Sequence, residues 1–370
     1  MRTLFEQDIL EILYGATLLG GGGGGSLKLG LKMLNKLKED GYRIEIDLLD
    51  VDEIGDDEYA AAVCALGSPV SMLDPDKPMF GPDGVYAFRA YQKAFYAQTG
   101  KQVSYLLSGE MGGHNTFTPM EVAIVSDWDP QKRIKLVDED NNRRACPELN
   151  TTLTTYWDLP PTPMGLGSWR GDEIAVYPVS DKSGEEIARQ MCQLFDNRIG
   201  FSTWGVNKAQ MKDALAVGCV TKAQQIGRAY FAARAGGSDL MDELRKATEI
   251  REFCRGRIER IETRVTGGFD CGTTVIADQT GRKYFIDFKN ENLLLRDQDG
   301  TVHLTAPEII GIHDLEAVEP LTNADTREGM ELLVTMSPAH ENWWNETRKP
   351  YECWMEEIRA IGFEGKPVRY

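Results

Sequence analysis

Several common sequence signatures are missing from this chain, and each absence narrows what the protein can be. No run of about 18 apolar residues occurs among its 370 residues, which excludes a membrane-spanning helix. The seven cysteines are an odd number without any C-x-x-C pair, which argues against a disulfide framework or a zinc knuckle. The N-terminal apolar run contains acids and lacks a small-residue cleavage site. We therefore expect reduced thiols, no membrane association and a cytoplasmic location.

The motifs of several enzyme classes are absent as well. There is no G-x-S-x-G elbow, no H-E-x-x-H helix and no Walker loop, so serine hydrolase, zincin and P-loop interpretations lack support. With only four histidines, a three-histidine metal site is not expected. The 41 basic and 58 acidic side chains leave a formal charge of −17, whose field repels nucleic acid and anionic membranes. We expect a small-molecule substrate and a homo-oligomer, because large α/β chains commonly form symmetric oligomers.

What is present is a regular alternation of apolar strands and helices. The predicted strands lie at 44–49, 60–66, 103–109 and 134–138, and the predicted helices near 84–98 and 118–126. This alternation is typical of βαβ units and a mainly parallel sheet. From residue 256, short apolar runs separated by Gly, Asp and Asn predict an antiparallel arrangement that ends in a Trp-rich helical tail. We predict an α/β domain at 1–254 and a C-terminal β-rich (α+β) domain at 255–370.

Three shorter segments carry further expectations. The N-terminus is predicted to be helical from its start, with Thr3 and Glu6 as a capping box. The proline-rich segment 159–172 is typical of a connection or a lid rather than of a core element. A run of helices is predicted at 207–252, with a helical hairpin that bends at Gly218.

Residues 20–25 are six consecutive glycines between two predicted helices. A dinucleotide-binding fingerprint requires a strand directly before the glycines, so the preceding helix weakens that interpretation. Glycines allow backbone N–H groups to converge on a ligand, and the next helix offers its positive N-terminal end. The alternative is a tightly packed loop in which only glycine fits. Gly21, Gly22, Gly23 and Gly24 are therefore candidate substrate-binding residues.

A polar segment follows the predicted strand at 103–109, at the end where open α/β sheets bind ligands. Glu110 can act as a general base or a metal ligand, and His114 as a metal ligand or an acid–base group. Asn115 can hold a substrate through its amide, and Gly113 lies beside it as a candidate binding residue. The alternative is a capped turn with a solvated Glu110.

A third polar segment, 138–148, follows the next predicted strand. Asp138 and Asp140 lie two positions apart and point the same way if the strand continues, which suits a divalent cation or proton transfer. Arg144 and Glu148 can pair with each other or orient a polar substrate. A solvated acidic loop is the alternative.

Together these segments resemble the S-methyl thiohydantoin desulfurase family of bacteria and archaea, which is associated with hydantoinase and oxoprolinase genes. The matching segments are 15–19 running into the glycines, Glu110-x-Gly-Gly-x-Asn115, Asp138-x-Asp140 leading to Arg144-Ala145-x-Pro147-Glu148, and Asn290-Glu291. The likeness extends more loosely to Asp314-Leu315 and to Arg327-Glu-Gly329. Five motifs in the same order are far more specific than any one of them.

The resemblance implies a two-domain hydrolase that replaces the S-methyl group of an S-methyl thiohydantoin with oxygen from water. The products would be a hydantoin and methanethiol, and Asn290 and Glu291 would be further substrate-binding residues. Two other functions stay open. One is a ligand-binding or accessory subunit of a hydantoinase- or oxoprolinase-type partner, and the other is a nucleotide-dependent enzyme that uses the glycine loop.

Such a hydrolysis needs an activated water and donors for the developing charge. We assign Glu110 or Asp138 as the base, Asn115 and the glycine amides as donors, and Arg144 as a clamp on an anionic substituent. We assign no cofactor, and the alternative to a carboxylate base is a divalent metal such as zinc, which would lower the pKa of the water. The candidate metal ligands are Asp138, Asp140, Glu110 and His114.

Overall fold

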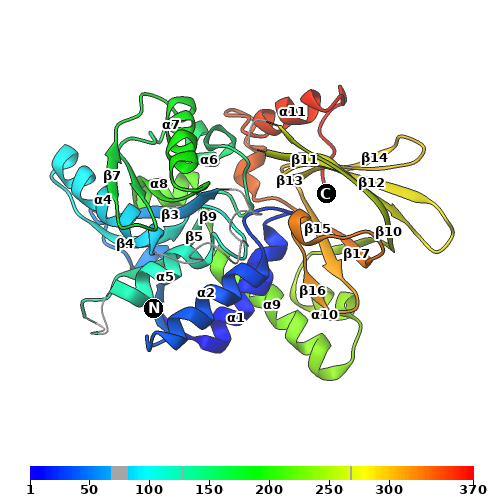
Figure 1. The fold of residues 1–370 in the computed structure, drawn as a ribbon, viewed down its shortest axis with the longest axis horizontal. Coiled ribbons are helices and arrows are strands. Elements are labelled where there is room, and N and C mark those ends of the chain that lie inside the picture. The colour runs from blue at the N-terminus through cyan, green and yellow to red at the C-terminus, as the bar shows by residue number, and fades with distance from the viewer. Residues whose placement is uncertain (68–81, 127–128, 130, 267–268) are drawn as a thin grey trace.

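Two β-sheets, one from each part of the chain, form the framework of the protein (Figure 1). The computed structural model describes residues 1–67, 82–126, 129, 131–266 and 269–370. The first sheet lies at the left of Figure 1 and the second at the right, and the N-terminal helix α1 (Glu6–Leu19) lies below their junction.

The first sheet is mixed, with a parallel centre. Its order is β1 (Arg2–Phe5), β2 (Glu45–Leu49), β5 (Lys135–Asp140), β4 (Val103–Ser108), β3 (Tyr59–Gly67), β8 (Arg198–Asn207), β6 (Met164–Gly167) and β7 (Glu173–Val176), with β9 (Ala216–Val217) paired to β5. The neighbours β2, β5, β4 and β3 are parallel. The outer pairs are antiparallel. The predicted α/β class is confirmed, and the parallel strands place their carboxyl ends at one edge.

Helices cover this sheet, and all of them except the short α6 lie where the sequence predicts helix. Their bounds are α2 (Leu27–Glu39), α4 (Asp83–Thr99), α5 (Phe117–Ser126), α6 (Leu153–Tyr156), α7 (Asp181–Leu194), α8 (Lys208–Ala214), α9 (Cys219–Gly236) and α10 (Leu240–Ala247). Short 3₁₀ turns lie at η1 (Val51–Glu53) and η2 (Leu149–Thr151). Helices α1 and α9 pack backbone to backbone, because Gly15 and Gly227 each stand where a Cβ would overlap the other helix. This contact fixes the end of α1, from which the glycine loop emerges.

The chain begins as a strand, so the predicted capping box at Thr3 is wrong. Leu4 lies opposite Ile46 in the antiparallel pair of β1 and β2. The Thr3 hydroxyl donates to Asp47 Oδ1 at 2.8 Å instead of capping a helix. Helix α1 starts at Glu6, and the Asp8 carboxylate accepts from the N–H of Phe5 at 2.9 Å. Tertiary pairing with β2 thus overrides the local helical signal.

Two parts of the middle segment also differ from expectation. The segment 159–172 was expected to be a connection or lid, which is wrong for Met164–Gly167, because these residues form the buried strand β6 between β8 and β7. Gly165 and Gly167 stand where a Cβ would overlap the backbone of α4, which explains glycine in this strand. Strand β8 had no predicted counterpart. At the expected bend, Gly218 adopts φ 72° directly before α9, but the short strand β9 precedes it.

The second sheet is antiparallel throughout its described pairs. Its order is β14 (Val302–Thr305), β13 (Glu291–Asp297), β12 (Lys283–Lys289), β11 (Phe269–Ala277), β10 (Arg251–Thr266), β17 (Glu331–Ser337), β15 (Ile309–Asp314) and β16 (Glu319–Pro320). The turn η3 (Asn323–Asp325) follows β16. The predicted β-rich C-terminal part is confirmed, although the proposed division at residues 254 and 255 falls inside β10.

The Trp-rich tail packs at the junction of the two sheets. It contains the 3₁₀ turn η4 (Glu341–Trp344) and the helix α11 (Tyr351–Ala360), of which the sequence predicts the helix. Trp343 and Trp354 are fully buried and meet edge to face, with ring centroids 5.9 Å apart. Trp343 Nε1 donates to the carbonyl of Asn142 at 2.9 Å. The tail therefore holds the loop that follows β5 against the second sheet.

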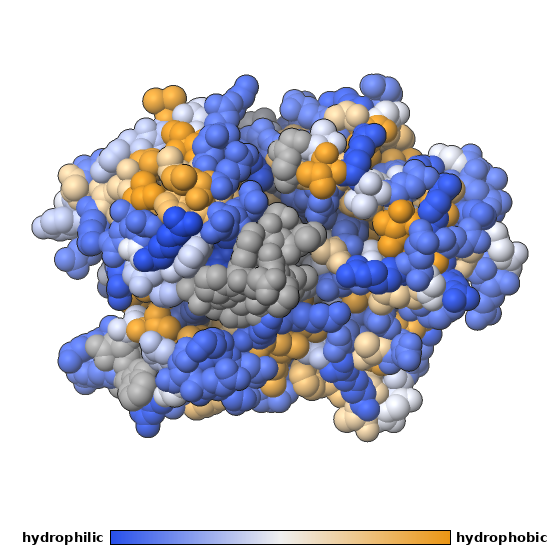
Figure 2. All heavy atoms as spheres, viewed as in Figure 1, coloured by the Kyte–Doolittle hydropathy of each residue, from blue (hydrophilic) through white to orange (hydrophobic). Residues whose placement is uncertain are grey.

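The outer face in Figure 2 is mostly hydrophilic, with hydrophobic residues in small separate groups. No helix in the described part of the chain is both long and apolar enough to span a membrane.

Candidate active site between the two sheets

A cavity of about 440 Å³ lies where the first sheet meets the second. The carboxyl ends of β3 and β4, the glycine loop and the loop after β5 form one side, and β10, the turn between β12 and β13, and η3 form the other. The cavity contains eight of the residues that the sequence singled out: Gly22, Gly23, Gly24, Glu110, His114, Asn115, Asn290 and Glu291. A space of this size accommodates a small heterocycle.

The glycine loop presents unused backbone donors to the cavity. Gly22, Gly24 and Gly25 have φ of 95°, 71° and 81°, a region that favours glycine. The carbonyl of Gly24 accepts from the N–H groups of His114 and Asn115, at 3.3 and 3.1 Å. Among the described residues, no acceptor is bonded to the N–H of Gly22, Gly24 or Gly25. These amides are therefore available to a ligand, beside the N-terminus of α2.

Glycine is also required in this loop by close approaches. A Cβ on Gly23 would overlap the carboxylate of Glu291, and a Cβ on Gly24 would overlap the carbonyl of Met111. A Cβ on Gly25 would overlap the side chain of His114. The loop therefore packs against both sides of the cavity, as the packed-loop interpretation expects, and leaves the N–H groups of Gly22, Gly24 and Gly25 without an acceptor among the described residues. Ligand binding by these amides stays a prediction.

Glu110 lies at the end of β4 with a fixed carboxylate. Asn115 Nδ2 donates to its Oε1, and the N–H of Cys146 donates to its Oε2 at 2.8 Å. Burial raises the pKa of Glu110 to about 7, against the two hydrogen bonds that lower it, and the nearby Asp140 raises it further. Glu110 can therefore gain or lose a proton near neutral pH.

Glu291 begins β13 and approaches Glu110 from the second sheet. Its side chain is 3% exposed, and its Oε2 accepts no hydrogen bond from any described group. Burial raises the pKa of Glu291 well above its ordinary value, and the charge of Glu110 raises it further, while Arg144, the backbone N–H of Glu291 itself and Lys289 lower it. Because the charge of one group raises the pKa of the other, the pair favours a state in which only one of the two carboxyl groups is ionised.

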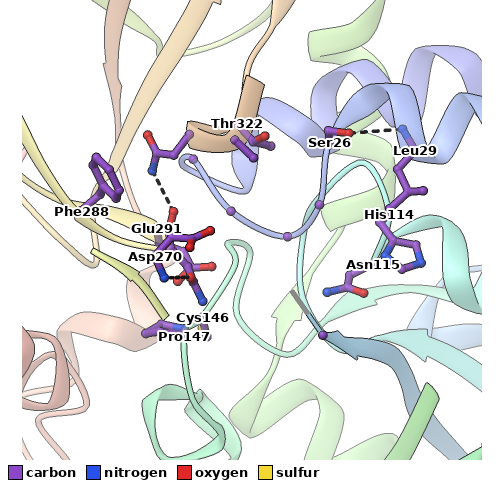
Figure 3. Close-up of a pocket in the computed structure, with 18 of the residues that line it drawn as sticks. Ser26, Leu29, His114, Asn115, Cys146, Pro147, Asp270, Phe288, Glu291 and Thr322 are labelled. Atoms are coloured by element: carbon purple, nitrogen blue, oxygen red, sulfur yellow. Dashed lines mark hydrogen bonds between the residues drawn. The ribbon is translucent and has the colours of Figure 1, made fainter. Parts of the chain in front are cut away.

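Other groups complete the cavity (Figure 3). The figure shows Glu291 and Asp270 on one side of the glycine loop, and His114 and Asn115 on the other. Burial lowers the pKa of His114 to about 3, so its imidazole is neutral at physiological pH. Cys146 also lines the cavity, and burial raises the pKa of its thiol.

Asn290 connects the wall of the cavity. It adopts φ 54°, and its Oδ1 accepts from the N–H of Asp270 at 3.0 Å. Its carbonyl accepts from Asn323 Nδ2 at 2.8 Å. Asn323 Nδ2 also donates to Asn292 Oδ1 at 2.9 Å. This network fixes the turn that presents Glu291.

Arg144 is placed differently from the substrate clamp that the sequence suggests. Its guanidinium is fully buried outside the cavity lining, 3.8 Å from the ring centroid of Trp354. It donates to the carbonyls of Pro307 and Glu308, at 2.7 and 3.2 Å, and to that of Ala145 at 3.0 Å. Through these hydrogen bonds, Arg144 holds the loop after β5 against the segment that leads into β15 of the second sheet.

Asp138 and Glu148 also lie outside the cavity lining. Asp138 accepts from the backbone N–H of Thr221 at 2.9 Å and from its hydroxyl, at the start of α9. Glu148 pairs with Lys289 at 2.7 Å rather than with an arginine. Gly21 and Gly113 lie just outside the lining, and Gly113 donates to the carbonyl of Gly25 at 2.9 Å.

The four candidate metal ligands do not gather in one place. Asp140 is buried, and its Oδ1 accepts from the N–H groups of Asn142 and Arg143. Asp138 is engaged with Thr221, whereas His114 lines the cavity. In the described ranges, no three His, Cys, Asp or Glu side chains are grouped so that they could hold a metal ion. The residues present therefore do not fit the metal site that the sequence suggested.

Several lining residues were not among the sequence candidates. Those with polar side chains are Ser26, Cys146, Arg189, Thr263, Arg264, Asp270, Thr322, Asn323, Thr326 and Arg327. Most come from β10, β11 and the segment around η3, and no spacing in the sequence indicates that they face the glycine loop. Arg327 was part of the more loosely matching segment Arg327-Glu-Gly329, and Cys146 stood at the unspecified position of another matching segment; the family resemblance was the signal that pointed to this part of the chain.

Comparisons with known proteins agree with this architecture. The model of the S-Me-THD-like N-terminal domain matches residues 7–177, and that of the S-Me-THD-like C-terminal domain matches residues 179–352. A crystal structure of a protein from Chromobacterium violaceum has the same fold, with a TM-score of 0.80 over 100% of both chains at 22% identity. No curated protein matches the chain. The two family models cover most of the sequence, and the chain belongs to the S-Me-THD-like family.

Proposed function

We propose that the protein is a hydrolytic desulfurase, which converts an S-methyl thiohydantoin to a hydantoin and releases methanethiol. The observation that carries this proposal is the position of Glu110, a fixed carboxylate with a pKa of about 7, in a cavity with free backbone donors. The family to which the chain belongs supports the substrate class.

Glu110 is suited to activate the attacking water. Each carboxylate oxygen already accepts one hydrogen bond, from Asn115 or from Cys146, so the group is oriented yet keeps a free lone pair. A carboxylate with a pKa near 7 takes up a proton most effectively at neutral pH. Water deprotonated by Glu110 attacks the ring carbon that bears the methylthio group.

The glycine amides are suited to receive the charge that this attack creates. When the oxygen adds, the electron pair of the C=N bond moves to the ring nitrogen. The N–H groups of Gly22, Gly24 and Gly25 have no other described acceptor and border the same cavity. Because the loop is packed on both sides, these donors need little reorganisation as charge develops.

The test is a thiol-release assay on purified protein. The substrates are a panel of 5-substituted S-methyl thiohydantoins, with the corresponding plain hydantoins as blanks, and mass spectrometry identifies the ring product. We expect catalytic release of methanethiol in step with hydantoin formation, and a loss of roughly 100-fold or more in Glu110→Gln.

Glu58→Gln is the matched control. Glu58 accepts from the Tyr105 hydroxyl at 2.7 Å and precedes β3, at the opposite end of the same sheet. It should retain normal turnover. Absence of thiol release from every compound in the panel, or full activity in Glu110→Gln, would contradict the proposal.

A further inference from the structure

We propose that Glu291 is the acid that protonates the departing thiolate, so that base and acid come from different sheets. This inference rests on the proposed function and adds a role for a residue that the sequence indicated only as part of a substrate-binding segment. Three observations carry it: the burial of Glu291, its unpartnered oxygen and the way in which its position is fixed.

An unpartnered, buried carboxyl oxygen needs an explanation. Glu291 is 3% exposed, lines the cavity, and has an Oε2 without a hydrogen-bond partner among the described residues. Burying an ionised carboxylate without a donor is costly, so the group is held as the neutral acid. A neutral acid that faces a cavity has a proton to give to what binds there.

The protein also holds this side chain in a fixed place. The turn before it is held by Asn290, with φ 54°, and by the hydrogen bonds of Asn323. On the opposite side, the backbone of Gly23 lies against the Glu291 carboxylate and leaves no room for a Cβ. Glu291 therefore stands beside the glycine amides that we assign to the developing negative charge.

Three charged groups around Glu291 affect its proton. Glu110 raises the pKa of Glu291, whereas Arg144 and Lys289 lower it. Lys289 is itself paired with Glu148 and Glu357, at 2.7 and 2.9 Å. Its charge is thus largely balanced, which favours the protonated form of Glu291 when Glu110 is ionised.

Glu110 and Glu291 together account for every proton that moves in the reaction. The oxygen of water forms a bond to the ring carbon, and Glu110 takes one proton of that water. The C–S bond then breaks as the C=N bond re-forms, and the leaving methanethiolate takes the proton of Glu291. The ring product is a hydroxyl tautomer that rearranges to the hydantoin. The pair ends with one proton, on Glu110, and its transfer to Glu291 restores the starting state.

The experiment compares two leaving groups on the same ring. The probes are the S-methyl and S-(2,2,2-trifluoroethyl) derivatives of one 2-thiohydantoin, because trifluoroethanethiolate leaves without being protonated. For Glu291→Gln we expect kcat to fall by roughly 100-fold with the S-methyl compound and by less than about tenfold with the trifluoroethyl compound. For Glu110→Gln, which removes the base, we expect a large loss with both compounds.

The outcomes separate the possible errors. Equal losses with both compounds in Glu291→Gln would overturn the acid role and leave a structural one, and unchanged S-methyl turnover would also overturn it. If the wild type releases thiol from neither compound, the proposed function itself is wrong, whatever the role of Glu291. Glu308→Gln, which alters a buried acid directly before β15 and outside the cavity, is the folding control, compared by thermal unfolding.

The pH dependence of the wild-type protein also tests the acid role of Glu291, without any substitution. As pH rises and Glu291 loses its proton, the S-methyl rate should fall while the trifluoroethyl rate does not. Parallel pH profiles for the two compounds at alkaline pH would contradict the inference.

Discussion

Asn115 joins Glu110 to the neighbouring strand β3. Its Nδ2 donates to Glu110 Oε1, while its Oδ1 accepts from the N–H of Ala65 at 3.0 Å. Because that backbone bond fixes the orientation of the amide, the amide must present its N–H to Glu110. The residue that the sequence suggested as a substrate donor thus orients the carboxylate, although it also borders the cavity.

Asn115→Ala should impair the base in a defined direction. The hydrogen bond from Asn115 lowers the pKa of Glu110, so its loss should raise this pKa and move the acid limb of the kcat/KM profile to higher pH. Turnover at neutral pH should fall by roughly tenfold or more, the usual range for a hydrogen bond to a charged group. The pH profile of kcat/KM is the measurement, and an acid limb that stays in place or moves down would show that the bond does not matter.

Asp140→Asn should have the opposite effect on the same limb. Asp140 is 0% exposed, and its charge raises the pKa of Glu110 by repulsion. The Oδ1 of an asparagine can still accept from the N–H groups of Asn142 and Arg143, so the local turn should persist. Removing the charge should lower the pKa of Glu110 and shift the acid limb to lower pH. A shift in the same direction as for Asn115→Ala would contradict the electrostatic account.

The sequence predicts the framework well because the fold follows from local patterns. Apolar runs of strand length alternating with amphipathic helices specify the parallel centre, and the position of Glu110 at the end of β4 follows from it. The predictions that are wrong failed because tertiary contacts decide the structure of those segments. Thr3 has a helical capping signal, but pairing of Leu4 with Ile46 makes the segment a strand. Strand β6 contains two glycines and follows prolines, and only the close approach of α4 explains its place.

The spacing of residues in the sequence could not predict which residues of the C-terminal part of the chain line the cavity. Glu291 lies far from Glu110 in sequence, and only the assembled junction places them together. The resemblance to a family was the signal that singled it out. Asp138 and Arg144 were credible candidates by residue type, but their hydrogen bonds to Thr221 and to the carbonyl of Pro307 become visible only in three dimensions.

Gly23→Ala should lower both activity and stability through a single steric contact, the one with Glu291. Gly23 does not have a positive φ, so alanine adds little backbone strain, but its Cβ would overlap the Glu291 carboxylate. We expect a loss of activity and a destabilisation of about 1–3 kcal/mol, measured by thiol release and by denaturant unfolding. The control is Gly236→Ala at the end of α9, where the nearest described atom, Ser238 Oγ, is 3.7 Å away. That variant should be fully active and as stable as the wild type or slightly more so. Equal effects of the two substitutions would refute the contact argument.

Glu139 should make the stability of the protein fall as pH rises. Its side chain is 0% exposed, and neither carboxyl oxygen has a hydrogen-bond partner among the described residues. Burial, followed by the charges of Asp138 and Asp50, raises its pKa from 4.5 to about 8, while Lys212 lowers it. Between these two pH values the folded chain keeps a proton that the unfolded chain releases, so the stability present at acidic pH is lost as pH rises through 8.

Glu139→Gln tests this prediction, because a neutral amide removes the titration. The free energy of unfolding by urea is measured for both proteins at pH 5 and at pH 8.5. Between these two pH values the wild type should lose more stability than the variant, by about 4 kcal/mol at most. Glu346→Gln changes an exposed acid and should leave the pH dependence as it is in the wild type. If Glu139→Gln and the wild type lose stability in parallel between these pH values, Glu139 is not the group responsible. The decrease would then arise from the other buried acids, first among them Asp140, whose pKa burial raises to about 7.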